Sequence, residues 1–138
     1  MDTAFDLRDY GGFDAFLRDC PARMVLTLIS DKWSLLAISA LTGGPLRHGE
    51  LRRRLEGVSP KMLTQTLRTL ERHGLVRRTQ YPTIPPQVEY SLTELGASLR
   101  TPVLALKGWA ESNIAEIVRA TEQYDAREPA APWHGASG

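Results

Sequence analysis

The sequence predicts a mainly helical α+β domain, and three observations support this prediction. Apolar residues recur at intervals of three and four over most of the chain, which is typical of amphipathic helices. The interval changes to two between residues 75 and 92, where prolines separate two short alternating segments. With 138 residues, of which 42% are hydrophobic, the chain has the length and apolar content of one compact domain.

The composition excludes several classes of protein. The chain contains one cysteine, Cys20, which excludes an intramolecular disulfide and a multi-cysteine zinc site. No run of about 18 apolar residues is present, and the first residues lack the charged and apolar regions of a signal peptide. We therefore expect a cytoplasmic protein that binds no membrane.

An enzyme or a metalloprotein needs a nucleophile with a base, or a group of metal ligands. The three histidines, His48, His73 and His134, show no metal-ligand spacing, and no glycine-rich phosphate loop or nucleophile motif is present. We expect no catalytic residue, no bound metal and no cofactor.

The two ends of the chain are expected to lie outside the folded domain. Residues 1–19 contain five aspartates and a glycine pair, which predicts a flexible arm with at most a short helix around residues 13–17. Residues 125–138 are rich in proline, alanine and glycine and show no periodicity, which predicts a disordered tail.

Two helices are expected after the arm. Pro21 favours a helix start, because proline at the first helical position gives up an N–H that has no partner there. Ser30 or Asp31 interrupts this helix. A second helix runs from Lys32 to the Gly43-Gly44 pair, which ends it.

A short third helix is expected over about residues 48–55, and the clearest helix start in the chain follows it at Ser59-Pro60. The serine oxygen is placed to accept a backbone N–H, and proline again occupies the first helical position. His73-Gly74 ends this fourth helix. Its apolar stripe consists of Met62 or Leu63, Leu67 and Leu70.

The alternation with a period of two predicts a β-hairpin. Residues 75–81 and 87–92 are its strands, and the prolines between them form a stiff tip. Thr93 caps a final helical segment, residues 93–124, in which we expect Pro102 to cause a kink or break near the middle.

This order of elements is that of a winged helix-turn-helix domain over residues 20–92, with a two-stranded β wing and a long C-terminal dimerisation helix. The fourth helix is then the recognition helix, and residues 75–91 form the wing. Many small α+β domains share such an order, so the distribution of charge is needed as a second criterion.

The net charge of +1 conceals a basic segment. Residues 44–81 contain nine basic and three acidic residues, a net charge of +6, whereas the rest of the chain contains eight basic and thirteen acidic residues, a net charge of −5. The basic segment coincides with the predicted helix-turn-helix and wing, which favours double-stranded DNA as a partner. The alternative is that these charges only form a solvated face.

Several short motifs occur in a fixed order between Cys20 and about Trp109, over about two thirds of the chain. They are Cys20-Pro21, Asp31-Lys32-Trp33, Leu46-Arg47-His48-Gly49-Glu50-Leu51, Ser59–Arg68, Leu70–Arg78, Tyr81–Thr93 and Leu95-Gly96. In these motifs the segment resembles the HxlR family of bacterial winged-helix transcriptional regulators, relatives of the MarR group. Two positions depart from the family pattern: Asp31, where glycine is more usual, and His48, where phenylalanine is.

A recognition helix reads base edges in the major groove with residues near its N-terminus. We expect Gln65 to pair with adenine and Arg68 with guanine, while Ser59 and Lys61 hold phosphate. Thr64 is placed to contact DNA as well. For Thr64 and Gln65 the alternative is a merely exposed polar position.

Basic residues outside this helix are expected to contact the DNA backbone. Arg77 and Arg78 on the wing, with Gln80 near its tip, would contact phosphates or reach into the minor groove. Arg52 and Arg53 would hold phosphate from the third helix.

One such unit reads too few base pairs for specificity in a genome, so we expect a homodimer on a pseudo-palindromic operator. The resemblance implies that the C-terminal and N-terminal helices join the two protomers. The alternative is that the C-terminal stripe packs on its own domain, as we expect of Trp109. The candidate interface residues are Val103, Leu106, Ala110, Ile114, Ile117 and Val118.

Cys20 is a candidate redox sensor. It precedes the first residue of a helix and lies near Arg18 and Arg23, where the helix dipole and the positive charges favour thiolate, although Asp19 opposes it. The resemblance implies that modification of Cys20, by an adduct or an intersubunit disulfide, switches the affinity for DNA. The alternative is a buried cysteine that only packs.

Together these features predict a sequence-specific DNA-binding transcriptional regulator, with repression as the expected effect, and not an enzyme. Two other functions remain open. One is a regulator that responds to a small molecule without redox sensing, whose effector the sequence does not name. The other is a winged-helix module in which the arginine-rich wing binds an acidic protein.

Overall fold

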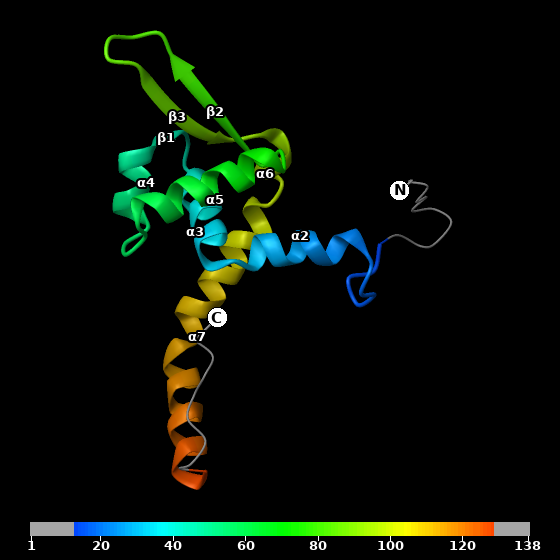
Figure 1. Cartoon of the computed structure of the whole chain (residues 1–138). Helices are drawn as coiled ribbons and strands as arrows, with labels where there is room; N and C mark the ends of the chain where they lie inside the picture. The colour runs from blue at the N-terminus through cyan, green and yellow to red at the C-terminus, as the bar shows by residue number, and fades with distance from the viewer. Residues whose placement is uncertain (1–12, 129–138) are drawn as a thin grey trace. The chain divides into compact units, whose positions relative to one another are not determined.

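The computed structural model describes residues 13–128 (Figure 1). The chain divides into two units, one up to Arg100 and one from Thr101 onward. The elements are α2 (Pro21–Ser30), α3 (Lys32–Leu41), β1 (Leu46–Arg47), α4 (His48–Arg54), α5 (Pro60–Arg72), β2 (Val76–Tyr81), β3 (Gln87–Leu92), α6 (Glu94–Ala97) and α7 (Arg100–Arg127).

The core of the first unit lies where α3, α4, α5 and the sheet meet. Its largest fully buried side chains are aliphatic, and most come from helices with one apolar side. Burying each of them contributes roughly 1.5–3 kcal/mol to the free energy of unfolding. These residues are Ile38, Leu51, Leu63, Leu67, Leu70 and Val76.

The predicted helix starts are confirmed. Ser59 Oγ accepts a hydrogen bond from the Met62 N–H at 3.0 Å, and Pro60 is the first residue of α5. An Asp31 carboxylate oxygen accepts from the Ser34 N–H at 3.1 Å and caps α3. Each cap satisfies one of the backbone donors that a helix leaves unpaired at its start.

The sheet has three antiparallel strands in the order β1-β3-β2. The hairpin pairs Val76 with Leu92 at its base and Tyr81 with Gln87 near its tip, as the alternating pattern predicts. β1, which places Leu46 opposite Tyr90, was not predicted, because two residues are too few to show an alternation. Figure 1 shows the hairpin extending beyond the helices α4 and α5.

The base of the hairpin is held by a short polar junction. The Thr93 N–H donates to the Leu75 carbonyl at 3.1 Å, and the Thr93 hydroxyl donates to the Gly74 carbonyl at 2.5 Å and accepts from the Gly96 N–H at 3.0 Å. A Cβ on Gly96 would overlap the Leu75 carbonyl. Gly74 has a φ of +78°, a conformation that favours glycine. The hairpin therefore leaves α5, which the sequence predicts to be the recognition helix, in one defined direction.

At the N-terminal end, where the sequence allows at most a short helix, residues 13–17 form none, and the Arg23 side chain donates to the carbonyls of Ala15 and Phe16. Two predictions for the C-terminal end are corrected. The C-terminal segment breaks between α6 and α7 and not at Pro102, which lies in the first turn of α7, where its missing N–H has no cost. α7 also continues to Arg127, so residues 125–127 of the predicted tail are helical.

The remaining predictions for the two ends, on residues 1–12 and 129–138, lie outside the described residues. Within the described part of the chain, no single helix has the length and apolar content to span a membrane. Only α2 and α3 taken together do, and a bend of 73° separates them.

Candidate nucleic-acid interface

α5 presents a polar stripe opposite its buried side. Leu63, Leu67 and Leu70 are at most 1% exposed, and the buried Thr66 extends this inner face. The residues on the other side of the helix recur at intervals of four, three and four and are all exposed: Lys61, Gln65, Arg68 and Arg72. The helical period therefore forms an outer face of three cations and one amide.

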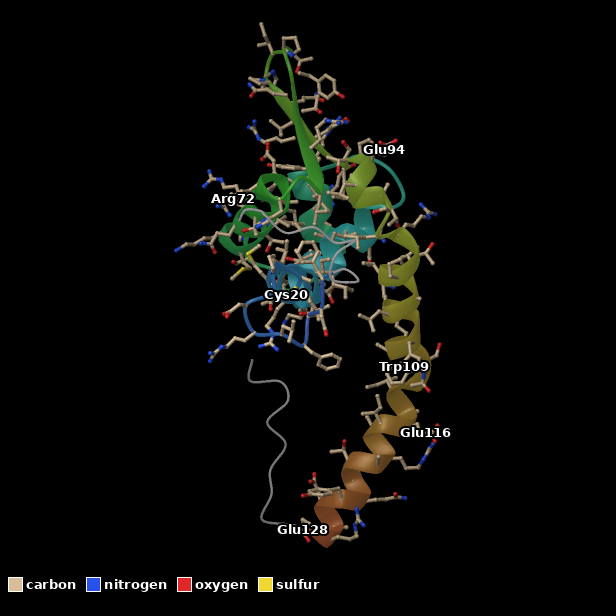
Figure 2. All side chains as sticks on the ribbon, turned by 90° about the vertical axis from the view of Figure 1, so that its right-hand side faces the viewer. Cys20, Arg72, Glu94, Trp109, Glu116 and Glu128 are labelled. Atoms are coloured by element: carbon tan, nitrogen blue, oxygen red, sulfur yellow. The ribbon has the colours of Figure 1, made fainter. Side chains whose placement is uncertain are left out.

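Three of these residues were predicted to contact DNA, and the fourth, Arg72, was not. Arg72 lies at the C-terminal end of α5 (Figure 2), whereas the prediction considered residues near the N-terminus. Its helical spacing from Lys61 and Arg68 is the signal that identifies it.

Ser59 and Thr64 differ from this outer stripe. Ser59 is exposed, but its oxygen caps α5. Thr64 is half-buried, and its hydroxyl lies 3.0 Å from His48 Nε2 in a hydrogen bond that joins α4 to α5. The structure thus gives both hydroxyls a role within the domain.

His48 is titratable and stands at the start of α4, beside the recognition helix. Burial lowers the pKa of His48 below its usual value of 6.5, and the positive charge of Arg52 lowers it further. Both effects favour the neutral imidazole, which can still bond with Thr64.

α4 carries three consecutive arginines on its exposed side. Arg52, Arg53 and Arg54 are exposed, while Leu51 is fully buried and anchors the helix. Arg52 and Arg53 also line a shallow hollow beside the turn between α4 and α5, together with Gly49, Glu56, Gly57 and Val58. The hollow thus lies next to the start of the recognition helix.

The wing residues lie on two faces of the hairpin. Arg78 pairs with Tyr90 and lies on the same face of the hairpin as Gln80. At the base of the hairpin this face is the buried side of the sheet, where Val76 lies. Arg77 points to the other face, because successive side chains of a strand alternate. The structure therefore brings Arg78 and Gln80 together and separates Arg77 from them.

The basic segment predicted from the sequence is available to an anionic partner. All nine of its lysine and arginine side chains are exposed, and none forms an ion pair with a carboxylate of residues 13–128. Across the wing, the Tyr81 hydroxyl donates to Glu89 Oε1 at 3.1 Å, and this hydrogen bond and the carboxylate charge raise the pKa of Tyr81. In the same residues no group of histidine, cysteine, aspartate and glutamate side chains could hold a metal ion.

Comparison with known proteins identifies this arrangement. A model of the HxlR-like helix-turn-helix family matches residues 28–118. The HTH-type transcriptional regulator YtfH of Escherichia coli K12 is 43% identical over 108 residues, which are 78% of this chain and 86% of YtfH. The chain belongs to the HxlR-like helix-turn-helix family.

Solved structures agree with this assignment. The transcriptional regulator ytfH from Salmonella typhimurium is 42% identical with a TM-score of 0.75, over 80% of this chain and 98% of that one. The redox regulator HypR in its oxidized form is 42% identical with a TM-score of 0.64, over 68% of this chain and 97% of that one. This HxlR-like protein is a transcriptional regulator with a helix-turn-helix DNA-binding domain, and not an enzyme.

Cys20 in this HxlR-like regulator is a free thiol at the start of α2 (Figure 2). It is the N-cap residue of the helix, but its side chain makes no capping hydrogen bond, and it is 8% exposed. The nearby Arg23, which was expected to support a thiolate, donates to backbone carbonyls of the preceding turn.

The predicted dimerisation residues of α7 divide into one buried residue and five exposed ones. Val103 is 2% exposed, so it is not part of an exposed stripe. Trp109, which lies in the same unit (Figure 2), is 58% exposed, and its packing on the first unit stays a prediction. The exposed residues of the predicted stripe are Leu106, Ala110, Ile114, Ile117 and Val118.

The contact between His48 and Thr64 predicts a pH-dependent stability. The unfolded chain keeps the usual histidine pKa of 6.5, whereas the folded value is lower. Between these two pKa values the unfolded chain binds more protons than the folded chain. The contribution of His48 to the free energy of unfolding is therefore complete above pH 6.5 and is lost as the pH falls through the folded pKa. We expect the Tm of the wild type to fall more steeply below pH 6.5 than that of His48→Asn.

At neutral pH the same variant loses the hydrogen bond and should be about 0.5–1.5 kcal/mol less stable. Thermal unfolding at a series of pH values measures both effects. Parallel curves of Tm against pH for the two proteins would contradict the assignment to His48.

Proposed function

We propose that this regulator is a sequence-specific repressor that binds a pseudo-palindromic operator as a homodimer. The observation that supports this most is the outer face of α5, where Lys61, Gln65, Arg68 and Arg72 are exposed opposite the buried leucines. A helix-turn-helix protein places this side of its second helix in the major groove.

The residues of α5 divide into base-reading and phosphate-binding groups. Gln65 can form two hydrogen bonds with adenine, and Arg68 can form two with guanine O6 and N7. Lys61 and Arg72 lie toward the two ends of the helix and would hold phosphates, as would the Ser59 hydroxyl. Thr64, already bonded to His48, orients α5 against α4 and is a weaker candidate for a base contact.

Contacts to the DNA backbone come from both sides of α5. Arg52 and Arg53 line the hollow beside the start of α5 and would take a phosphate there. On the wing, Arg77 and Arg78 point to opposite faces of the hairpin, so they would meet different phosphates, with Gln80 next to Arg78. Since phosphate contacts carry no sequence information, these residues give affinity for any DNA.

A homodimer is supported by apolar surface that the protomer leaves exposed. In the second unit, α7 exposes large side chains along most of its length, including Leu106, Trp109 and Ile114. In the first unit, α2 buries none of its residues and exposes Met24 and Leu26, each at 58%. Exposed apolar surface of this kind marks an interaction site.

The first test separates specific from general binding. We expect Arg68→Ala to weaken binding to the operator by about 1–3 kcal/mol and to relax one base position, because it removes a base contact. Arg77→Ala should weaken operator and random DNA alike and flatten the salt dependence, since it removes a phosphate contact. Gel shifts on the protein's own upstream region and on random DNA measure both.

Arg77→Ala thus serves as the matched control for Arg68→Ala. Equal losses on operator and random DNA for Arg68→Ala would refute its role in reading bases. If the wild type gives no gel shift on DNA selected from a random pool, the proposed function itself is refuted. A protein partner for the basic wing would then be favoured.

The dimer is tested on α7. At micromolar concentration we expect the wild type to have the mass of two chains, and Ile114→Glu to dissociate it, because a charge in an apolar interface loses its hydration without a partner. Ser112→Glu adds the same charge on the opposite side of α7 and should leave the dimer intact. Light scattering gives the masses, and a monomeric wild type is the outcome that rejects the dimer.

A second candidate function, switching by thiol modification, is favoured by the similarity to the redox regulator HypR. An oxidant such as diamide would take two hydrogen atoms from the Cys20 thiols of two subunits and leave a disulfide between them, while an electrophile would add to one thiol. The buried position of Cys20 requires the adjoining turn to open first.

Cys20→Ser removes the only sulfhydryl of the chain and tests this switch. We expect diamide or a quinone to release wild-type protein from the operator and to leave the variant bound, because serine forms neither a disulfide nor a thioether. Gel shifts with and without oxidant measure the release. If the variant is released as readily as the wild type, Cys20 only packs, and a regulator that responds to a small molecule without redox chemistry is favoured.

A further inference from the structure

The tip of the wing presents an apolar side chain that no part of residues 13–128 covers. Ile84 is 101% exposed, the largest exposed fraction of any large hydrophobic residue in the described part of the chain. The DNA contacts proposed above do not involve it. Its side chain is therefore available to an apolar partner.

The tip also holds this side chain in a defined place. Prolines flank it on both sides and have a fixed φ, and the Thr83 hydroxyl donates to the Pro85 carbonyl at 2.8 Å. Below the tip, the hydrogen bond from Tyr81 to Glu89 joins the two strands. A side chain on such a tip has little conformational freedom to lose when it meets a partner.

The tip has no positive charge of its own. Between Arg78 and Arg100 the only charged residues are Glu89 and Glu94, so attraction to phosphate cannot hold the tip on DNA. The positive charges of the wing lie nearer the base of the hairpin, at Arg77 and Arg78. These two side chains point to opposite faces of the hairpin.

The spacing between these arginines and the tip is long enough to reach the floor of a minor groove. A strand advances by about 3.3 Å per residue, so Tyr81, the last residue of β2, lies roughly 10 Å beyond Arg78, and Ile84 follows it in the tip. The minor groove of B-DNA is about 7.5 Å deep. Arginines that meet the phosphates on the two sides of the groove therefore bring the tip to the base edges.

We propose that Ile84 enters the minor groove of the operator and wedges against one base step, which it partly unstacks. Minor-groove proteins use single apolar side chains, isoleucine among them, in this way. A protein partner would need roughly 800 Å² on each side of an interface, far more than this tip offers. The favoured step is pyrimidine–purine, which is the easiest to deform.

This proposal rests on the proposed function, and its test uses the full chain on an operator selected from random DNA. Single adenines of that operator, outside the recognition-helix sites, are replaced one at a time by 2-aminopurine, whose fluorescence rises on unstacking. We expect one position to brighten with the wild type and with Ile84→Leu, and to stay dark with Ile84→Ser.

Ile84→Ser should also bind the operator about 10-fold more weakly, because the deformed step loses its apolar contact. The slope of affinity against salt should stay as in the wild type, since no charge is removed. Leu95→Ser, an aliphatic residue that is 60% exposed outside the wing, is the matched control and should leave affinity and fluorescence unchanged.

Brightening that persists in Ile84→Ser overturns the proposal, and so does a wild-type complex in which no position brightens. Both outcomes leave DNA binding itself intact. If the wild type binds no selected DNA at all, the result is a different one. It refutes the proposed function, on which this inference rests.

Discussion

The burial of one face of α5 is the interaction on which the rest of the structure depends. A helix of this length is only marginally stable by itself in water. It forms because Leu63, Leu67 and Leu70 are enclosed by α3, α4 and the sheet. Since the helix has one apolar side, the same packing turns Arg68 and its neighbours outward. The exposed polar face of α5 is thus a consequence of the core, and a variant that loosens the core would displace all the side chains of that face together.

Both ends of α5 are fixed by residues whose chemistry can be read from the sequence. Ser59 caps the start, and Gly57 and Gly74, with φ of +95° and +78°, allow the sharp turns before and after the helix. These residues act locally, so their pattern alone predicts the helix bounds. The alternation of residues 75–81 and 87–92 likewise predicts the hairpin, because a strand pair needs only a period of two and a turn.

The features that the sequence does not predict depend on contacts between distant residues. β1 exists only because Leu46 pairs with Tyr90, and Arg77 and Arg78 are adjacent in sequence yet face apart once the sheet defines an inner side. His48 stands where the family pattern favours phenylalanine, and only the fold brings it to Thr64 of the recognition helix. Pro102 is the opposite case, a residue whose local pattern predicts a break that the fold does not have there. The helix is already interrupted between α6 and α7, so Pro102 lies in the first turn of α7, where proline is tolerated.

The distribution of charge explains how a chain with a net charge of +1 presents a surface for a polyanion. In physiological salt a charge acts over about 8 Å, so DNA responds to the groups nearest to it and not to the sum over the protein. In the proposed complex those groups are the exposed cations of residues 44–81, a segment with a net charge of +6. The −5 on the remaining segments disfavours contact between those parts and DNA. In the proposed complex, binding is thereby restricted to one face, where the uncharged Gln65 would discriminate between bases while the neighbouring arginines supply the affinity.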